Sequence, residues 1–311
     1  MALVLLPHLL MLVFPRWKDY IGSMAQTHPI AFTKMNGLGN DFVVIDARRN
    51  QTVLTGDHVR VLAARDNSDT RGCDQILVLH PPRGDGHVFM QIFNSDGSEV
   101  EACGNGARAV AVFLAAQGSA TCTLETLGGL LHARATHENA EIDMPLPKFT
   151  ASDIPCSADQ EDMGALTLHA DLPPAFMVNI GNPHAVIFVE TGTAGLAARY
   201  GFELENSQHL PAGANINFAS HDGATVLRLD TWERGAGLTK ACGTGACATA
   251  VAAVERGLMR AGPLTIRPPF NTHGNDVDVL DITYTPGELL SMRGPVTYEF
   301  DAETMLESAA G

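Results

Sequence analysis

The sequence predicts an α+β fold made of two pseudo-symmetric, β-rich domains, each wrapped around one central buried helix. The main observation is an internal repeat: ACGNGARAVA at residues 102–111 returns as ACGTGACATA at residues 241–250, with seven identities in ten positions. A weaker match precedes each copy, GNDFVVID at residues 39–46 and GNPHAVIFV at residues 181–189. A repeat distance this long indicates duplication of a whole domain rather than a solenoid. We therefore expect a functional site in the cleft between the two domains.

The matching segments set the predicted domain boundaries. We expect residues 1–28 to be an N-terminal extension outside the fold, residues 29–144 to be the first domain, and residues 145–294 to be the second, with residues 295–311 returning to the first as a strand. The apolar run at residues 1–14 is too short to span a bilayer, and basic residues follow it rather than precede it, unlike in a signal peptide. We interpret residues 1 to about 23 as the product of an upstream start codon, with an uncleaved anchor or an export signal as the alternatives.

The predicted elements come in the same order in both domains. Short runs rich in Val, Ile and aromatic residues, bounded by Gly, Pro, Asn or Asp, indicate strands. They cover residues 75–80 and 87–94 in the first domain and residues 175–180 and 225–232 in the second. The Ala-rich segments 104–118 and 243–257 are apolar nearly all round, which is typical of a helix buried on every side. Strands must therefore surround each helix.

The overall composition excludes several classes of partner. The chain carries 20 Lys and Arg against 35 Asp and Glu, a formal charge of −15, which repels nucleic acid and anionic membrane surfaces. Six cysteines with no CxxC pair do not form the disulfide framework of a small secreted protein, so we expect a cytoplasmic protein. We also expect no metal site at the repeat, because no second Cys or His stands at ligand spacing from either repeated cysteine.

The repeat places Cys103 and Cys242 at the N-terminal ends of the two predicted helices. A helix N-terminus presents unpaired N–H groups and about half a positive charge, so it binds anions and lowers the pKa of a thiol. Two such ends facing each other would place one thiol on each side of a bound molecule. One thiolate could then remove a proton from one face while the other thiol returns a proton to the opposite face. We expect Cys122, Cys156 and Cys247 to be small buried hydrophobes, and Cys73 to pack in the core or in a loop rather than near the cleft.

Polar residues in turns surround the two copies of the repeat. Any single Asn here is compatible with ordinary turn chemistry. ERGAG at residues 233–237 is more informative, because an acid and a base at the end of a strand precede a glycine loop that leads to Cys242. Such a pair could hold an ammonium and a carboxylate. The polar candidates are Asn40, Asn94, Asn182, His184, Asn215, Glu233 and Arg234.

From Phe32 to the C-terminus, the chain resembles the diaminopimelate epimerases. The resemblance rests on KMNGLGNDF (34–42), DQILV (74–78), IFNSDGSEVEACGNGAR (92–108), GNPHAV (181–186), GANINF (213–218) and ERGAGLTKACGTGAC (233–247). It implies interconversion of LL- and meso-diaminopimelate in lysine and peptidoglycan precursor biosynthesis, by a homodimer with no cofactor. The sequence departs from the family pattern at Cys73, where glycine is common before DQ, and at Phe300, where a tyrosine often makes the dimer contact.

The resemblance also implies roles for particular residues. Cys103 and Cys242 would be the acid/base pair, and His184 and Glu233 would assist the two thiols. The backbone of Gly104, Asn105, Gly243 and Thr244 would receive the reacting carboxylate. The remaining amine and carboxylate groups of the substrate would be bound by Asn40, Gln75, Asn94, Asn182, Asn215, Glu233 and Arg234.

Two other interpretations remain at this point. One is a racemase or isomerase of another amino acid, similar to proline racemases, which lack ERGAG, or to phenazine-biosynthesis isomerases, which generally lack the cysteine pair. ERGAG together with four asparagines is more polar than a substrate with one ionic end requires. The other interpretation is a non-catalytic amino-acid-binding or thiol redox protein. A binding protein, however, needs no pair of equivalent thiols, and a redox pair needs no duplicated carboxylate site.

Overall fold

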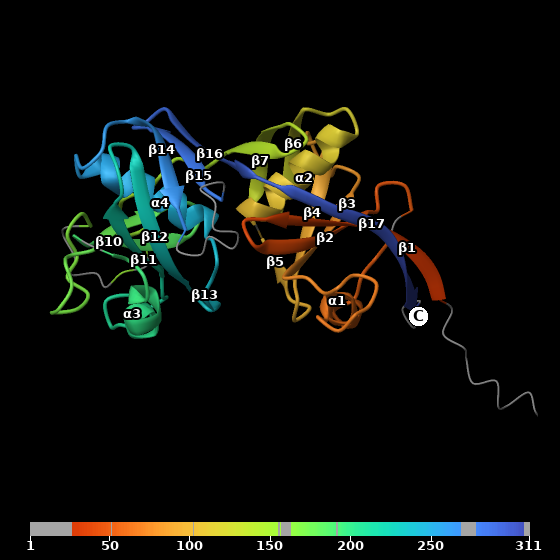
Figure 1. Ribbon diagram of the computed structural model, residues 1–311, viewed down its shortest axis with the longest axis horizontal. Coiled ribbons are helices and arrows are strands. Elements are labelled where there is room, and N and C mark those ends of the chain that lie inside the picture. The colour runs from red at the N-terminus through yellow and green to blue at the C-terminus, as the bar shows by residue number, and fades with distance from the viewer. Residues whose placement is uncertain are drawn as a thin grey trace, which may run out of the picture.

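The computed structural model describes residues 27–50, 52–101, 103–154, 156, 163–190, 192–268 and 278–307. Figure 1 shows two lobes side by side, one built around helix α2 (Gly104–Ala116) and the other around helix α4 (Gly243–Glu255). We call them the first half and the second half. Of the predicted N-terminal extension, only residues 27 and 28 are among the described residues. They are the first two residues of strand β1, which begins at Thr27, so the fold starts two residues earlier than predicted.

The first half is a mixed sheet. Its strands pair in the order β1, β2, β3, β4, β6, β7 and β8, with β5 beside β4. The β2–β3 and β4–β6 pairs are parallel, and the other pairs are antiparallel. The bounds are β1 Thr27–Gly37, β2 Asn40–Asp46, β3 Gln75–His80, β4 Val88–Asn94, β5 Glu99–Val100, β6 Thr121–Thr126, β7 Gly129–Ala135 and β8 Asn139–Asp143.

The second half repeats this arrangement strand by strand. Its order is β9, β10, β11, β12, β14, β15 and β16, with β13 beside β12, and its parallel pairs are β10–β11 and β12–β14. The repeat seen in two sequence segments therefore extends over the whole sheet. The bounds are β9 Phe176–Asn179, β10 Pro183–Phe188, β11 Asn215–His221, β12 Val226–Glu233, β13 Gly237–Leu238, β14 Gly262–Arg267, β15 Leu280–Thr285 and β16 Leu289–Pro295.

The two halves are joined where β8 and β16 pair antiparallel, with Ile142 opposite Met292. After β8 the chain enters the second half, where Lys148 bridges to Asn179 of β9. After β16 it returns to the first half as β17 (Thr297–Glu307), which lies along β1. Figure 1 shows the chain passing from the second lobe to the first through β16 and β17. We propose that the two halves are the two domains, since the predicted boundary at residue 145 falls just after β8.

The central helices form as the sequence predicts, because their small apolar residues allow strands to pack closely on all sides. Helix α2 contacts β1, β2, β3, β6, β7 and β8, and helix α4 contacts β9, β10, β11, β12, β14, β15 and β16. Ala107, Ala109 and Ala111 in α2 and Ala246 and Ala248 in α4 are fully buried. The predicted α+β class, with a β-rich half around each buried helix, is confirmed.

Two further helices cover the outer faces of the sheet. Helix α1 (Gly56–Ala63) packs on the first half and α3 (Leu196–Glu205) on the second. As a result, neighbouring residues of β2 bury in opposite directions, Val44 toward α2 and Val43 toward α1. A strand covered on both faces becomes apolar at every position, which explains runs such as QILVLH.

Candidate active site

Cys103 and Cys242 occupy equivalent positions as the N-cap residues of α2 and α4. Each thiol accepts a hydrogen bond from the backbone N–H three residues later, from Gly106 at 3.2 Å and from Gly245 at 3.3 Å. The sulfur thus takes the place of the usual Ser or Asp side chain at a helix N-cap. Cys242 is buried and Cys103 is half-buried. The predicted placement of both cysteines at helix N-termini is therefore what the structure shows.

Glycines after each cysteine allow the two helix ends to approach each other and the sheet. A Cβ at Gly104 would lie 3.0 Å from the Met292 side chain, and a Cβ at Gly243 would lie 2.9 Å from the same side chain. Both helix N-termini therefore converge on Met292, at the junction of the two halves. The second glycine of each repeat faces a strand, because a Cβ at Gly245 would lie 2.6 Å from Asn217 Oδ1.

A cavity of about 620 Å³ lies between the two halves and is lined by both cysteines. This volume is typical of small-molecule sites. Eleven of the predicted site residues line it: Asn40, Gln75, Asn94, Cys103, Gly104, Asn105, Asn182, Glu233, Cys242, Gly243 and Thr244. Sequence reasoning missed further lining residues, among them Asp74 and Lys240. Both could have been predicted from their positions next to candidate residues, since Asp74 precedes Gln75 and Lys240 lies two residues before Cys242.

Three predicted residues do not line this cavity. His184 is fully buried beneath it, and its Nε2 lies 2.8 Å from Asn182 Oδ1. Asn215 is also buried, and its Oδ1 accepts the backbone N–H of Arg234 at 2.9 Å. The Arg234 side chain is exposed, and its guanidinium donates to the carbonyl of Ala212 at 3.1 Å. The roles predicted for these three residues stay predictions.

The polar lining of the first half is held by hydrogen bonds. Asn40 Nδ2 donates to Asp74 Oδ2 at 3.0 Å, and Arg65 forms an ion pair with Asp74. Gln75 Nε2 donates to Asn94 Oδ1 at 3.0 Å across the β3–β4 pair. These contacts fix which polar atoms remain for a ligand.

Two side-chain amide oxygens in the cavity lining are buried and have no hydrogen-bond partner among the described residues. They are the side-chain oxygens Gln75 Oε1 and Asn105 Oδ1. A buried acceptor without a donor costs about 1–3 kcal/mol, so a ligand that supplies donors gains from filling it. The carboxylates of Asp74 and Glu233 line the same cavity. This combination suits an ammonium group, whereas the helix N-termini suit a carboxylate.

Burial raises the pKa of both site cysteines. At Cys103, the hydrogen bond from Gly106 and the positive charge of Arg108 oppose this increase. At Cys242 the pKa lies well above the ordinary value, because the negative charge of Glu233 adds to the effect of burial. Burial also raises the pKa of Glu233, whose carboxyl group interacts with the Cys242 thiol. The thiol form of both side chains is therefore favoured at neutral pH.

The other cysteines differ from this pair. Cys122 and Cys247 are buried as expected, and Cys73 lies in the core beside α1. Cys156 is only half-buried, so the expectation of a buried position was wrong for that residue. Its backbone N–H and its thiol both contact the Ile154 carbonyl, and its side chain packs against the apolar cluster beneath α3.

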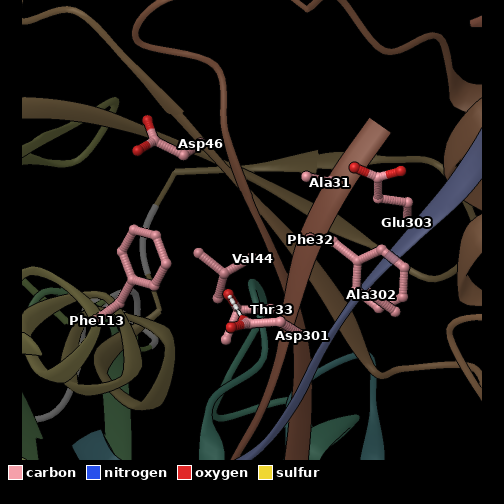
Figure 2. Close-up of a pocket in the computed structure, with 9 residues that line it drawn as sticks. All are labelled: Ala31, Phe32, Thr33, Val44, Asp46, Phe113, Asp301, Ala302 and Glu303. Carbon is pink, nitrogen blue, oxygen red and sulfur yellow. Dashed lines mark hydrogen bonds between the residues drawn. The ribbon is translucent and has the colours of Figure 1, made fainter. Parts of the chain in front are cut away.

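A second hollow, of about 400 Å³, lies where β1 meets β17 (Figure 2). Thr33 donates to Asp301 at 2.6 Å within it, and Phe32 and Phe113 supply apolar surface. None of the predicted site residues lines it. Within the described ranges, no group of three or more His, Cys, Asp or Glu side chains is arranged to hold a metal ion. No helix in that same part of the chain is long and apolar enough to cross a bilayer.

The fold is one shared by racemases and epimerases. The crystal structure of a hydroxyproline epimerase from Agrobacterium vitis superimposes with a TM-score of 0.62 at 14% identity, over 90% of this chain and 94% of that chain. At this level of identity the likeness shows the fold alone.

Sequence similarity identifies the family. The model of the diaminopimelate epimerase family matches residues 32–149 and 176–284. The chain is 42% identical to the diaminopimelate epimerase of Sphingopyxis alaskensis, over 88% of this chain and 96% of the relative. It is 41% identical to that of Rhizorhabdus wittichii, over 90% of this chain and 97% of the relative. The chain belongs to the diaminopimelate epimerase family and is an isomerase.

Proposed function

We propose that the protein interconverts LL- and meso-2,6-diaminopimelate without a cofactor, through an acid/base pair formed by Cys103 and Cys242. The observation that carries this proposal is the pair of N-capping thiols at matched helix ends on one cavity. The family relatives are diaminopimelate epimerases by name, which supports the choice of substrate.

In the proposed reaction, one cysteine is the thiolate and the other is the thiol. The thiolate takes the α-proton from one face of the substrate, and the thiol delivers its proton to the opposite face. The two cysteines exchange protonation states, so no net charge is gained or lost, and the reverse reaction begins from the exchanged state. Glu233 interacts with the Cys242 thiol and would assist its proton transfer.

The two helix ends would stabilise the carbanion. The N–H groups of the first turns, at Gly104, Asn105, Gly243 and Thr244, bind the reacting carboxylate, onto which negative charge moves as the proton leaves. Fixed donors aimed at developing charge are among the largest contributions to catalysis. The positive ends of both helix dipoles would face this carboxylate, because the two N-termini converge at Met292.

The substrate's other charged groups would be bound by the polar lining. Gln75 Oε1 and Asn105 Oδ1 have unused acceptor capacity for an ammonium group. Asn40, Asn94 and Asn182 extend the polar lining, and Asn215 supports it from below. We propose that Arg234 binds the distal carboxylate after its exposed side chain turns from Ala212 toward the cavity.

We also propose that the enzyme acts in the cytoplasm, as a homodimer, in lysine and peptidoglycan precursor biosynthesis. All six cysteines are free thiols, which suits a reducing compartment. Phe300 packs inside its own chain, with its ring 6.2 Å from that of Phe32. Tyr298 and Met305 on the same strand are 52% and 58% exposed, which leaves apolar surface on β17 for a second copy.

The test is incubation with LL-diaminopimelate in deuterium oxide, with deuterium followed at the α-carbon. The wild-type enzyme should form meso product that carries deuterium at one α-carbon, whereas Cys103→Ala and Cys242→Ala should form none. Product without solvent deuterium would exclude the proposed proton exchange. Equal activity on proline would favour a broader amino-acid racemase.

A further inference from the structure

The two halves differ in the layer directly beneath their central helices. Under α4, three buried polar side chains, His184, Asn217 and Thr231, stand on adjacent strands β10, β11 and β12. The equivalent positions under α2, on β2, β3 and β4, are Phe42, Leu77 and Ile92, all buried in one apolar cluster. The two halves thus share one backbone arrangement but differ in these side chains, because only the Cys242 side has a polar triad.

The contacts of Asn217 determine how its amide is oriented. Its Nδ2 lies 3.3 Å from the carbonyl of Ala185 and 3.3 Å from that of Asn215. Two carbonyl acceptors identify this end of the amide as the NH₂ group. The opposite end, Oδ1, accepts the hydroxyl of Thr231 at 3.1 Å.

This orientation defines the proton position on His184. Asn217 Nδ2 lies 3.1 Å from His184 Nδ1, and an amide NH₂ group cannot accept a hydrogen bond, so Nδ1 is not the protonated nitrogen. The single proton of the neutral imidazole is then on Nε2, which lies 2.8 Å from Asn182 Oδ1 and donates to it. The amide oxygen of Asn182 is thereby occupied, and its NH₂ group is left for the cavity that Asn182 lines.

We propose that Asn217 is a positioning residue that holds His184 as the Nε2–H tautomer, so that His184 fixes Asn182 with its NH₂ donor available to the substrate. The inference rests on the proposed function and deepens it, because it makes His184 a neutral hydrogen-bond donor rather than a proton-transfer group. Burial, with the nearby positive charge of Arg234, lowers the pKa of His184 to about 3 and supports a neutral ring.

The first test reads the tautomer directly. In ¹⁵N-histidine-labelled enzyme, the His184 ring, assigned by its absence from the His184→Gln spectrum, should show the Nε2–H pattern unchanged between pH 6 and 8. An Nδ1–H tautomer or an imidazolium in this range would overturn the proposal. This measurement needs no substrate, so an enzyme inactive on diaminopimelate but with the expected spectrum would contradict only the proposed function.

The second test compares variants that copy the first half. Asn217→Leu copies Leu77 and should raise KM for diaminopimelate about tenfold, with a smaller change in kcat, as expected for one misplaced hydrogen bond. Leu77→Val is the matched control on the other half and should leave KM within about twofold. If Asn217→Leu left KM unchanged and lowered only thermal stability, together with the kcat lost through unfolding, Asn217 would have a structural role alone. That result would overturn the proposal.

A third comparison separates positioning from proton transfer. His184→Phe copies Phe42 and removes the donor to Asn182, so its KM should rise about tenfold as well. His184→Gln keeps an acceptor for Asn217 and a donor for Asn182, and it should recover most of that loss although it cannot shuttle a proton. Equal loss of activity in both variants would show that His184 transfers protons and would refute the positioning role.

Discussion

Replacement of Gly245 by alanine tests how closely the second thiol is held. The added Cβ would lie 2.6 Å from Asn217 Oδ1, about 0.8 Å closer than ordinary contact, which begins at 3.4 Å. Asn217 cannot move away, because Thr231 and two backbone carbonyls hold its amide. The first turn of α4 must shift instead, and Cys242 moves with it. A displacement approaching 1 Å costs on the order of 10²-fold in rate.

Gly106→Ala is the matched variant in the first half. There the Cβ would lie 3.1 Å from the end of the flexible Leu77 side chain, which can rotate away. Alanine is also favoured over glycine inside a helix by about 1 kcal/mol, which offsets the remaining strain. We therefore expect kcat within about tenfold of wild type for Gly106→Ala and a loss of about 10²-fold for Gly245→Ala, with about 1–3 kcal/mol lower unfolding free energy in the latter.

The assay is kcat for deuterium incorporation from LL-diaminopimelate, together with thermal unfolding of each variant. Gly245→Ala with near wild-type kcat would refute the argument that Asn217 fixes the position of this helix end. Losses of the same size in the two glycine variants would also refute it, because the reasoning depends on a rigid amide in one half and a flexible leucine in the other.

The remaining predictions concern the thiols and the distal end of the substrate. Cys103→Ala and Cys242→Ala should each abolish epimerisation, and near wild-type turnover in one of them would contradict the two-base scheme. Serine at either position should leave a trace of activity, because a hydroxyl can still transfer a proton. Burial raises the pKa of both thiols, so the thiolate fraction at neutral pH is small and grows as pH increases. We therefore expect kcat/KM to rise from pH 7 to beyond about 8.5, the ordinary thiol pKa. A flat pH profile would contradict the raised pKa of the two thiols. Arg234→Met should lower kcat/KM for diaminopimelate, while lysine should be an equally poor substrate for the wild type and the variant. The Lys240 side chain already lines the cavity, so a larger loss in Lys240→Met would assign the distal carboxylate to Lys240 instead.

The sequence was most informative where one residue pattern allows only one environment. The all-round apolar pattern of residues 104–118 and 243–257 predicted two enclosed helices, and the duplicated cysteines predicted their N-caps. Helices α1 and α3 were not predicted. Helix α1 has only eight residues, and α3 begins after Gly195 without a side-chain cap.

The site was less predictable beneath its surface. His184 follows Asn182 by two positions, and the sequence alone does not show that one lines the cavity while the other lies under it. That difference comes from the packing of α4 against β10 and β11. Asn217 was overlooked although it lies in GANINF, the segment from which Asn215 was chosen as a candidate. Its importance depends on Thr231 of β12, which becomes its neighbour only when the strands pair.

The return of β17 to β1 has a consequence for synthesis on the ribosome. Ile30 finds its partner Thr304 only when almost the whole chain has been made. Until then, β1 presents an open hydrogen-bonding edge, which is a known route to aggregation. Pairing across such a sequence separation also slows folding. The nascent first half therefore has to wait for the last strand, and a chain released before β17 is translated should be a target for chaperones and proteases rather than a stable half-enzyme.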